Sequence, residues 1–263
     1  MKTKTFKGTK TGKKILVERF DSLSELLMVG SKREQNFGEP RDSMAVSLGF
    51  PNWSTLEDAV FNDPRKISSL RNKVKAAYST GVRRRDKLSV EGGTPCVPAY
   101  LIGAPTSMIR KDKIVTKGRF LQIVLDCCYP WTVSKKDVEE YYTGVVETIA
   151  SLSAQGYRIS ITGFASFTEP HDPDASVVFV ELKGSREKFN LKKLMFSLSH
   201  EAMLRGLLFD WYQRSGGVEL YAYGTPVSYW STRDKEDFLS DLGIKDTFIS
   251  FKSDYKGILC SKN

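Results

Sequence analysis

The strongest constraint on the fold is an apolar run, Phe120-Leu-Gln-Ile-Val-Leu125, followed closely by a long amphipathic segment. A short run of this composition predicts a strand that is buried on both faces. The segment after it begins at a sequence resembling a capping box, Ser134-Lys-Lys-Asp137, and continues with apolar residues at helical spacing. These residues are Val138, Tyr141, Tyr142, Val145, Ile149 and Leu152. A buried strand followed by an amphipathic helix is typical of an α/β layered fold.

The remaining C-terminal pattern alternates between strands and helices. Strands are expected at 157–161 and 177–180, and the short link between them predicts an antiparallel hairpin. The order is completed by helices at 190–196 and about 202–212, a strand at 218–223, a helix at 235–242 and a strand at 247–251. The predicted fold class is therefore α/β, with a three-layer, mixed and mostly parallel sheet and helices on both faces.

The N-terminal half differs from the rest of the chain in charge. Residues 1–118 hold 23 Lys and Arg against 12 Asp and Glu, whereas residues 119–263 hold 17 against 19. We therefore expect a flexible basic arm at 1–14, a basic and mainly helical region at 15–118, and an α/β domain at 119–263. Within the second region the pattern predicts a strand at 15–17, helices at 22–27, 54–61 and 64–78, and an extended segment at 97–101.

Cysteine spacing and hydropathy indicate the cellular setting. The adjacent pair Cys127–Cys128 suits neither a disulfide nor a zinc site, and Cys96 and Cys260 add no framework spacing. No apolar run approaches the roughly 18 residues that a membrane span needs, and no apolar stretch follows the basic N-terminus. No glycine-rich phosphate loop is present. The expectation is a cytoplasmic protein without membrane contact, bound metal or other cofactor.

A cluster of basic residues is the strongest physical signal for a ligand. Residues 65–87 contain nine basic side chains and one acid, Asp86, and a basic loop is expected at 110–117. Such a surface favours phosphate contacts, although a solvated junction between a helix and a loop has the same composition. The candidate nucleic-acid-binding residues are Arg65, Lys66, Arg71, Lys73, Lys75, Arg83, Arg84, Arg85, Lys87, Arg110, Lys111 and Lys113.

Catalytic candidates are few. Asp126 ends the first strand of the α/β region, and ligands of such sheets gather at the carboxyl ends of strands. Glu169, His171 and Asp172 follow the neighbouring strand and would complete a site for a divalent cation. The alternative is a polar, proline-stiffened surface loop. His200 lies between two helical stretches, where a histidine serves as a general base, caps a helix or satisfies a core carbonyl.

Three segments resemble an uncharacterised bacteriophage family. They are Trp53 with Ser54-Thr-Leu-Glu-Asp-Ala59, the run Val97-Pro-Ala-Tyr-Leu-Ile-Gly-Ala-Pro-Thr-Ser-Met108, and Phe196-Ser-Leu-Ser-His200 continuing to Phe209. The sequence departs from this pattern at Glu201, where a proline is expected. The resemblance implies a phage origin and an infected bacterial cell as the setting, but no activity.

The order of elements after residue 119 also resembles a von Willebrand factor A-like domain. The metal site of that fold would need Asp-x-Ser-x-Ser, and the corresponding residues here are Asp126-Cys127-Cys128-Tyr129-Pro130. Both serines are missing, so the resemblance implies that the usual metal site is empty.

Three functions remain open. The favoured one is a non-enzymatic factor that binds a phage or host protein. The second is a protein that binds DNA or RNA through the basic N-terminal half. The third is a metal-dependent hydrolase or nuclease built on Asp126, Glu169, His171 and Asp172. The sequence gives no indication of the oligomeric state.

Overall fold

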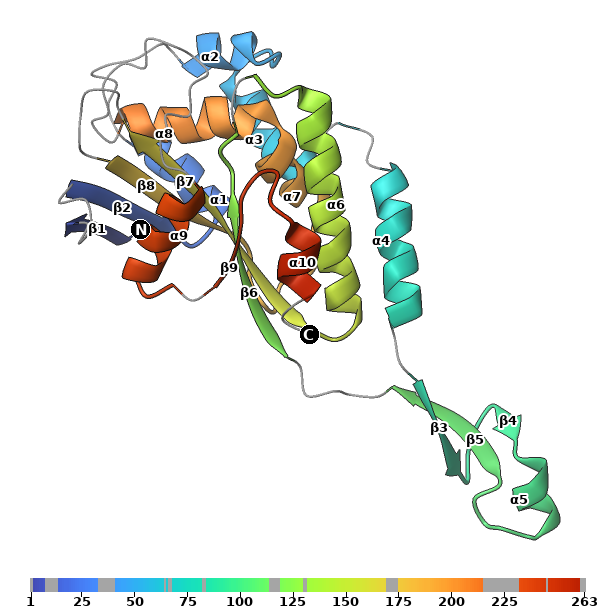
Figure 1. Ribbon diagram of the computed structural model, residues 1–263. Coiled ribbons are helices and arrows are strands. Elements are labelled where there is room, and N and C mark those ends of the chain that lie inside the picture. Colours follow the sequence, from blue (N-terminus) through green and yellow to red (C-terminus); the bar gives the residue numbers. More distant parts are fainter. Residues whose placement is uncertain are drawn as a thin grey trace.

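The computed structural model describes most of the chain (Figure 1). The described residues are 2–7, 14–32, 41–63, 65, 68–81, 84–113, 119–129, 132–168, 175–214, 232–244 and 246–260. Within these ranges, no helix is both long and apolar enough to cross a bilayer.

A six-stranded mixed sheet with the order β1-β2-β8-β7-β6-β9 forms the centre of the molecule. Parallel pairing joins β2 to β8, β6 to β7 and β6 to β9, whereas β1–β2 and β7–β8 are antiparallel. The predicted hairpin between the second and third C-terminal strands is therefore confirmed. The strands are β1 Lys2–Lys7, β2 Lys14–Phe20, β6 Phe120–Asp126, β7 Arg158–Thr168, β8 Ala175–Lys183 and β9 Thr247–Ile249.

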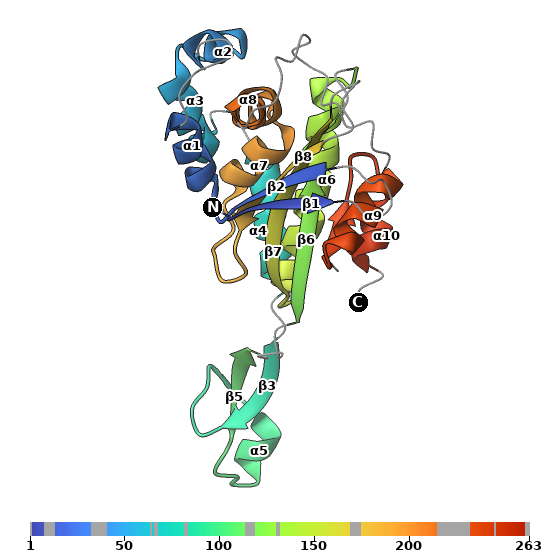
Figure 2. The same cartoon turned by 90° about the vertical axis from the view of Figure 1, so that its left-hand side faces the viewer.

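Helices cover both faces of this sheet (Figure 2). On one face, Ile123, Leu125 and Ile161 share a core with the helices α1, α3, α4, α6, α7 and α8. On the other face, Val124 and Phe164 pack with Phe238 of α9. The helices of this body are α1 Leu23–Lys32, α2 Arg41–Ser47, α3 Trp53–Asn62, α4 Ser68–Gly81, α6 Lys135–Ala154, α7 Leu191–Ser199, the π-helix η1 Met203–Leu208, α8 Phe209–Arg214, α9 Thr232–Asp241 and α10 Tyr255–Cys260.

The long central helix follows the sequence pattern closely. Ser134 caps α6, because its hydroxyl accepts a hydrogen bond from the Asp137 N–H at 3.1 Å. The residues of the predicted apolar stripe are buried, except Tyr141, which is half-buried. Beyond the C-terminal end of α6, Gly156 adopts φ +100°, which an L-residue rarely adopts and which suits a glycine stop. The strand expected at 218–223 lies outside the described residues.

The N-terminal region holds strands as well as the helices expected of it. β1 is a strand where a flexible arm at 1–14 was expected, and β2 extends the predicted strand at 15–17 and joins β8 of the main sheet. α2 forms within a segment that carries no clear periodicity. The pairing of β2 with β8 joins distant parts of the chain, and a sequence pattern alone does not identify the partner of a strand.

A second unit, residues 84–113, is separate from the body in both views (Figures 1 and 2). We call it the projecting module. It holds a three-stranded sheet in the order β3-β5-β4 and one short helix. Its elements are β3 Arg84–Ser89, β4 Thr94–Pro95, α5 Val97–Leu101 and β5 Met108–Lys113.

Two predictions for this module are wrong. Residues 97–101 form a helix rather than an extended segment, because Pro98 lies in the first turn, where a missing N–H costs nothing. Residues 110–113 form a strand rather than a loop, because they pair with 84–87 in antiparallel register.

Candidate functional site

The carboxyl end of β6 carries a buried ion pair. Asp126 is 1% exposed, and its Oδ2 accepts a hydrogen bond from Lys235 Nζ of α9 at 2.6 Å. Its Oδ1 accepts one from the Cys128 N–H at 3.0 Å. The lysine thus places a positive charge directly beside the buried carboxylate.

Burial and the mutual attraction of the two charges both shift the pKa values of this pair. Desolvation raises the pKa of Asp126, although the Lys235 ammonium and the Cys128 amide oppose that shift. Burial alone would lower the pKa of Lys235, but the neighbouring Asp126 and Cys128 together oppose burial and raise that pKa. Lys235 therefore remains an ammonium at neutral pH, and the pair joins α9 to the end of the sheet.

The two neighbouring thiols are packed rather than reactive. Cys127 and Cys128 are buried, and burial raises the pKa of Cys128 to about 12 and that of Cys127 well above its ordinary value. The Tyr142 hydroxyl of α6 donates a hydrogen bond to the Asp126 carbonyl oxygen from the opposite side. The strand end is thus held by helices from both layers.

The residues proposed to complete a metal site with Asp126 cannot be placed beside it. Glu169, His171 and Asp172 lie outside the described residues, so that grouping stays a prediction. Within the described ranges, no three His, Cys, Asp or Glu side chains gather as they would around a metal ion. The role of Lys235 was missed in the sequence, which gave no sign that α9 returns to β6.

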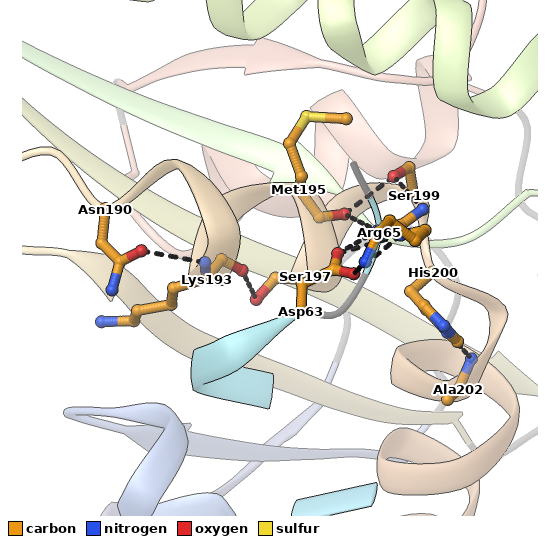
Figure 3. A network of polar contacts seen from close by, with 9 residues as sticks. All are labelled: Asp63, Arg65, Asn190, Lys193, Met195, Ser197, Ser199, His200 and Ala202. Carbon is orange, nitrogen blue, oxygen red and sulfur yellow. Dashed lines mark hydrogen bonds and ion pairs between the residues drawn. The ribbon is translucent and has the colours of Figure 1, made fainter. Parts of the chain in front are cut away.

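A second polar cluster joins the α3–α4 turn to the C-terminal end of α7 (Figure 3). The Arg65 guanidinium contacts the buried Asp63 carboxylate, with Nη2 to Oδ2 at 2.6 Å. It also donates hydrogen bonds to Ser199 Oγ and to the Met195 carbonyl oxygen, both at 3.1 Å. Arg65 was predicted to contact nucleic acid, but its guanidinium is used here to hold the body together.

His200 acts as a cap between α7 and η1. Its Nδ1 accepts a hydrogen bond from the Ala202 N–H at 3.1 Å, and its ring stacks on Phe196 at 4.8 Å between centroids. Burial, followed by the charge of Arg65, lowers the pKa of His200 to about 4. Of the roles expected for this histidine, the structure supports the helix cap.

The other basic candidates are divided between the body and the projecting module. On α4, Lys73 pairs with Glu147 of α6 at 2.8 Å, whereas Arg71 and Lys75 are exposed. Lys66 and Arg83 lie outside the described residues. The remaining candidates lie on the paired strands β3 and β5 of the module: Arg84, Arg85, Lys87, Arg110, Lys111 and Lys113.

The strands β3 and β5, which we call the basic ribbon, concentrate positive charge. Their twelve residues include six Lys and Arg and two acids, Asp86 and Asp112. Lys87 and Arg110 are Cα partners in the register, and both are exposed. Residues directly opposite in an antiparallel pair share a face, so these two cations lie together on one side of the ribbon.

The opposite end of the module is apolar and exposed. Val97, Tyr100, Leu101 and Ile102, which we call the apolar tip, are 59%, 70%, 76% and 81% exposed. Hydrogen bonds hold the backbone around them, from the Cys96 N–H to the Ser107 carbonyl oxygen at 2.7 Å and from the Ala104 N–H to the Ala99 carbonyl oxygen at 3.0 Å. The tip is thus a formed turn that presents apolar side chains to solvent.

Comparison with known proteins assigns the chain to a family. A family model described as a domain of unknown function (DUF7192) matches residues 3–248. No curated protein and no solved structure matches the chain.

Proposed function

Because the chain belongs to the DUF7192 family, whose description assigns no activity, we propose its function from its own surface: it binds nucleic acid through the basic ribbon. The observation that carries this proposal is the charge of two paired strands that project from the body, with six cations against two acids. β-Ribbons fit the grooves of a duplex, and lysine and arginine supply phosphate contacts.

The distribution of cations along the molecule favours a rod-like polyanion. Arg71 and Lys75 are exposed on α4, which leads directly along the chain into β3. In Figure 1, α4 lies beside α6 on the body and its C-terminal end faces the projecting module, so basic residues occur along a path rather than in one spot. A duplex lying along this path would contact phosphates over several base pairs.

The body is proposed to act as a scaffold rather than as a catalyst. The parallel β6–β7 unit, the antiparallel β8 and the helices on both faces are compatible with a von Willebrand factor A-like arrangement. In that arrangement Lys235 lies where a divalent cation would be held. The resemblance to a phage family supports a phage origin and the cytoplasm of an infected bacterium as the setting.

A protein-interaction factor is the second candidate, and the apolar tip favours it. An ordered apolar surface on a projecting module is typical of a binding site. A protein that buried only the tip would leave the basic ribbon unused, so affinity for it would depend little on salt. Nucleic acid uses the ribbon, and its affinity would fall steeply with salt.

Fluorescence anisotropy with a labelled random-sequence duplex of about 30 base pairs tests the first proposal. If the module neutralises about six phosphates, raising salt from about 50 to about 200 mM should weaken binding about a thousandfold. Charge reversal at both Lys87 and Arg110 should weaken binding at least about tenfold and make the salt dependence shallower by about two phosphates.

The matched control reverses a charge on the body. Lys136 is an exposed α6 residue whose side chain is 82% exposed, and Lys136→Glu should leave binding within about twofold. Absence of duplex binding by the wild-type chain at about 50 mM salt would refute the proposal. Equal losses in the module and control variants would refute the assignment to the ribbon.

A further inference from the structure

The projecting module combines a cationic ribbon with an apolar end, and the apolar end is not needed for phosphate contact. Among the described residues of 84–113, the large apolar side chains point mostly to solvent, and Ala99 is the buried apolar residue. Units below about 40 residues rarely bury enough apolar surface to be stable alone. A partner that covers the tip would remove this exposed surface from water.

The charge on the module limits what that partner can be. The ribbon is basic, whereas the segment between its strands, 90–107, carries a single charged residue, Glu91. The ligand therefore needs an anionic surface that meets the ribbon and an apolar interior that accepts the tip. A duplex has both, with phosphates outside and stacked bases inside.

We infer that Leu101 and Ile102 form a wedge that enters the base stack, so the module prefers duplexes that are already kinked or mismatched. This inference rests on the proposed nucleic-acid function and names the form of the substrate. Leucine and isoleucine are among the side chains that proteins insert between base steps. Unstacking costs the least free energy at a mismatch, so a wedge should bind a mismatched duplex more tightly than a matched one.

The geometry of the tip fits this role. Leu101 and Ile102 are its two most exposed side chains, and they follow one another where α5 ends. Gly103 comes next with φ +68°, which turns the chain back sharply toward β5. In Figures 1 and 2, α5 lies at the end of the module farther from the body, so the body does not cover the tip.

The test compares two labelled duplexes that differ only by a central mismatch. The wild-type chain should bind the mismatched duplex about tenfold more tightly than the matched one. The double variant Leu101→Ser/Ile102→Ser should lose that preference to within about twofold, with little change in affinity for the matched duplex. A donor–acceptor dye pair at the duplex ends should report bending by the wild-type chain and not by the variant.

Matched variants test whether a lost mismatch preference comes from the tip itself. Val46 on α2 is 60% exposed, so Val46→Ser removes an exposed apolar side chain from the body and should keep the preference. Both serine substitutions in the tip replace exposed side chains, so circular dichroism should show an unchanged fold. Charge reversal at Lys87 and Arg110 should weaken binding to both duplexes equally.

The outcomes distinguish the two proposals. Duplex binding without a mismatch preference would overturn the wedge and leave the ribbon proposal standing. No binding to either duplex would overturn both. Binding to vesicles of phosphatidylcholine and anionic phosphatidylglycerol that is lost in the tip variant, without a mismatch preference, would overturn the wedge in favour of a membrane contact.

Discussion

The body and the projecting module differ in how far they bury apolar side chains and in where they place charged ones. In the body, most large apolar side chains are buried, and the buried charges Asp126, Lys235 and Asp63 are matched by partners within hydrogen-bonding distance. In the module, apolar side chains of the tip are exposed, and cations line two paired strands. A body stabilised by its own contacts can therefore carry a module whose apolar tip it does not bury.

The largest effect on the stability of the body is expected when the lysine of the buried ion pair is removed. Lys235→Met leaves the Asp126 carboxylate buried without its cation, and we expect a loss of about 3–5 kcal/mol in the free energy of unfolding. The double variant Asp126→Asn/Lys235→Met should regain much of this loss, since no uncompensated charge remains. Urea denaturation followed by circular dichroism measures both.

An exposed lysine serves as the control for that prediction. Lys136 approaches Glu140 at 3.9 Å on the surface of α6, and Lys136→Met should change stability by less than about 0.5 kcal/mol. A Lys235→Met variant as stable as this control would show that the buried pair does not hold α9 to the sheet.

The next prediction destabilises the module while sparing the body. A Cβ at Gly92 would lie 2.5 Å from the Ile109 carbonyl oxygen of β5, so Gly92→Ala forces the module apart at an expected cost of about 1–3 kcal/mol. Hydrogen exchange should speed up within 84–113 and stay unchanged in α6. Gly93 is the matched control, since a Cβ there meets nothing within 4 Å. Faster exchange throughout the body would contradict the separation of the two units.

A pH-dependent prediction concerns the cap at His200. The pKa of His200 is lowered from 6.5 to about 4 in the folded chain, so folding favours the neutral ring. The contribution of the neutral ring to the free energy of unfolding is complete above pH 6.5 and is lost as the pH falls toward 4. His200→Asn keeps a capping oxygen without the titration, and its urea midpoint should therefore fall less between neutral and acidic pH. Parallel pH profiles for the two proteins would rule out this linkage.

The smallest effect is expected in thiol reactivity. Cys96 of the module is half-buried, whereas Cys127 and Cys128 of the body are buried and have raised pKa values. In a Cys260→Ser background, an alkylating reagent at mildly alkaline pH should label Cys96 first, and the adjacent pair should react only on unfolding. Mass spectrometry locates the label. Early labelling at Cys127 would mean that the end of β6 opens.

Some of this structure was readable from the sequence because the relevant physics is local. The apolar run of β6 and the capping serine and apolar stripe of α6 depend on residues a few positions apart. The concentration of charge at 84–87 and 110–113 was also visible as composition. These features need only periodicity and capping chemistry.

Other features depended on contacts between distant parts of the chain. Three contacts join residues separated by more than a hundred positions: the pairing of β2 with β8, the ion pair of Lys235 with Asp126, and the hydrogen bond from Arg65 to Ser199. The sequence alone determined that an α/β core and a basic surface exist. Only the tertiary structure decided which cations stabilise the body and which project from it, because burial depends on what the rest of the chain packs against each residue.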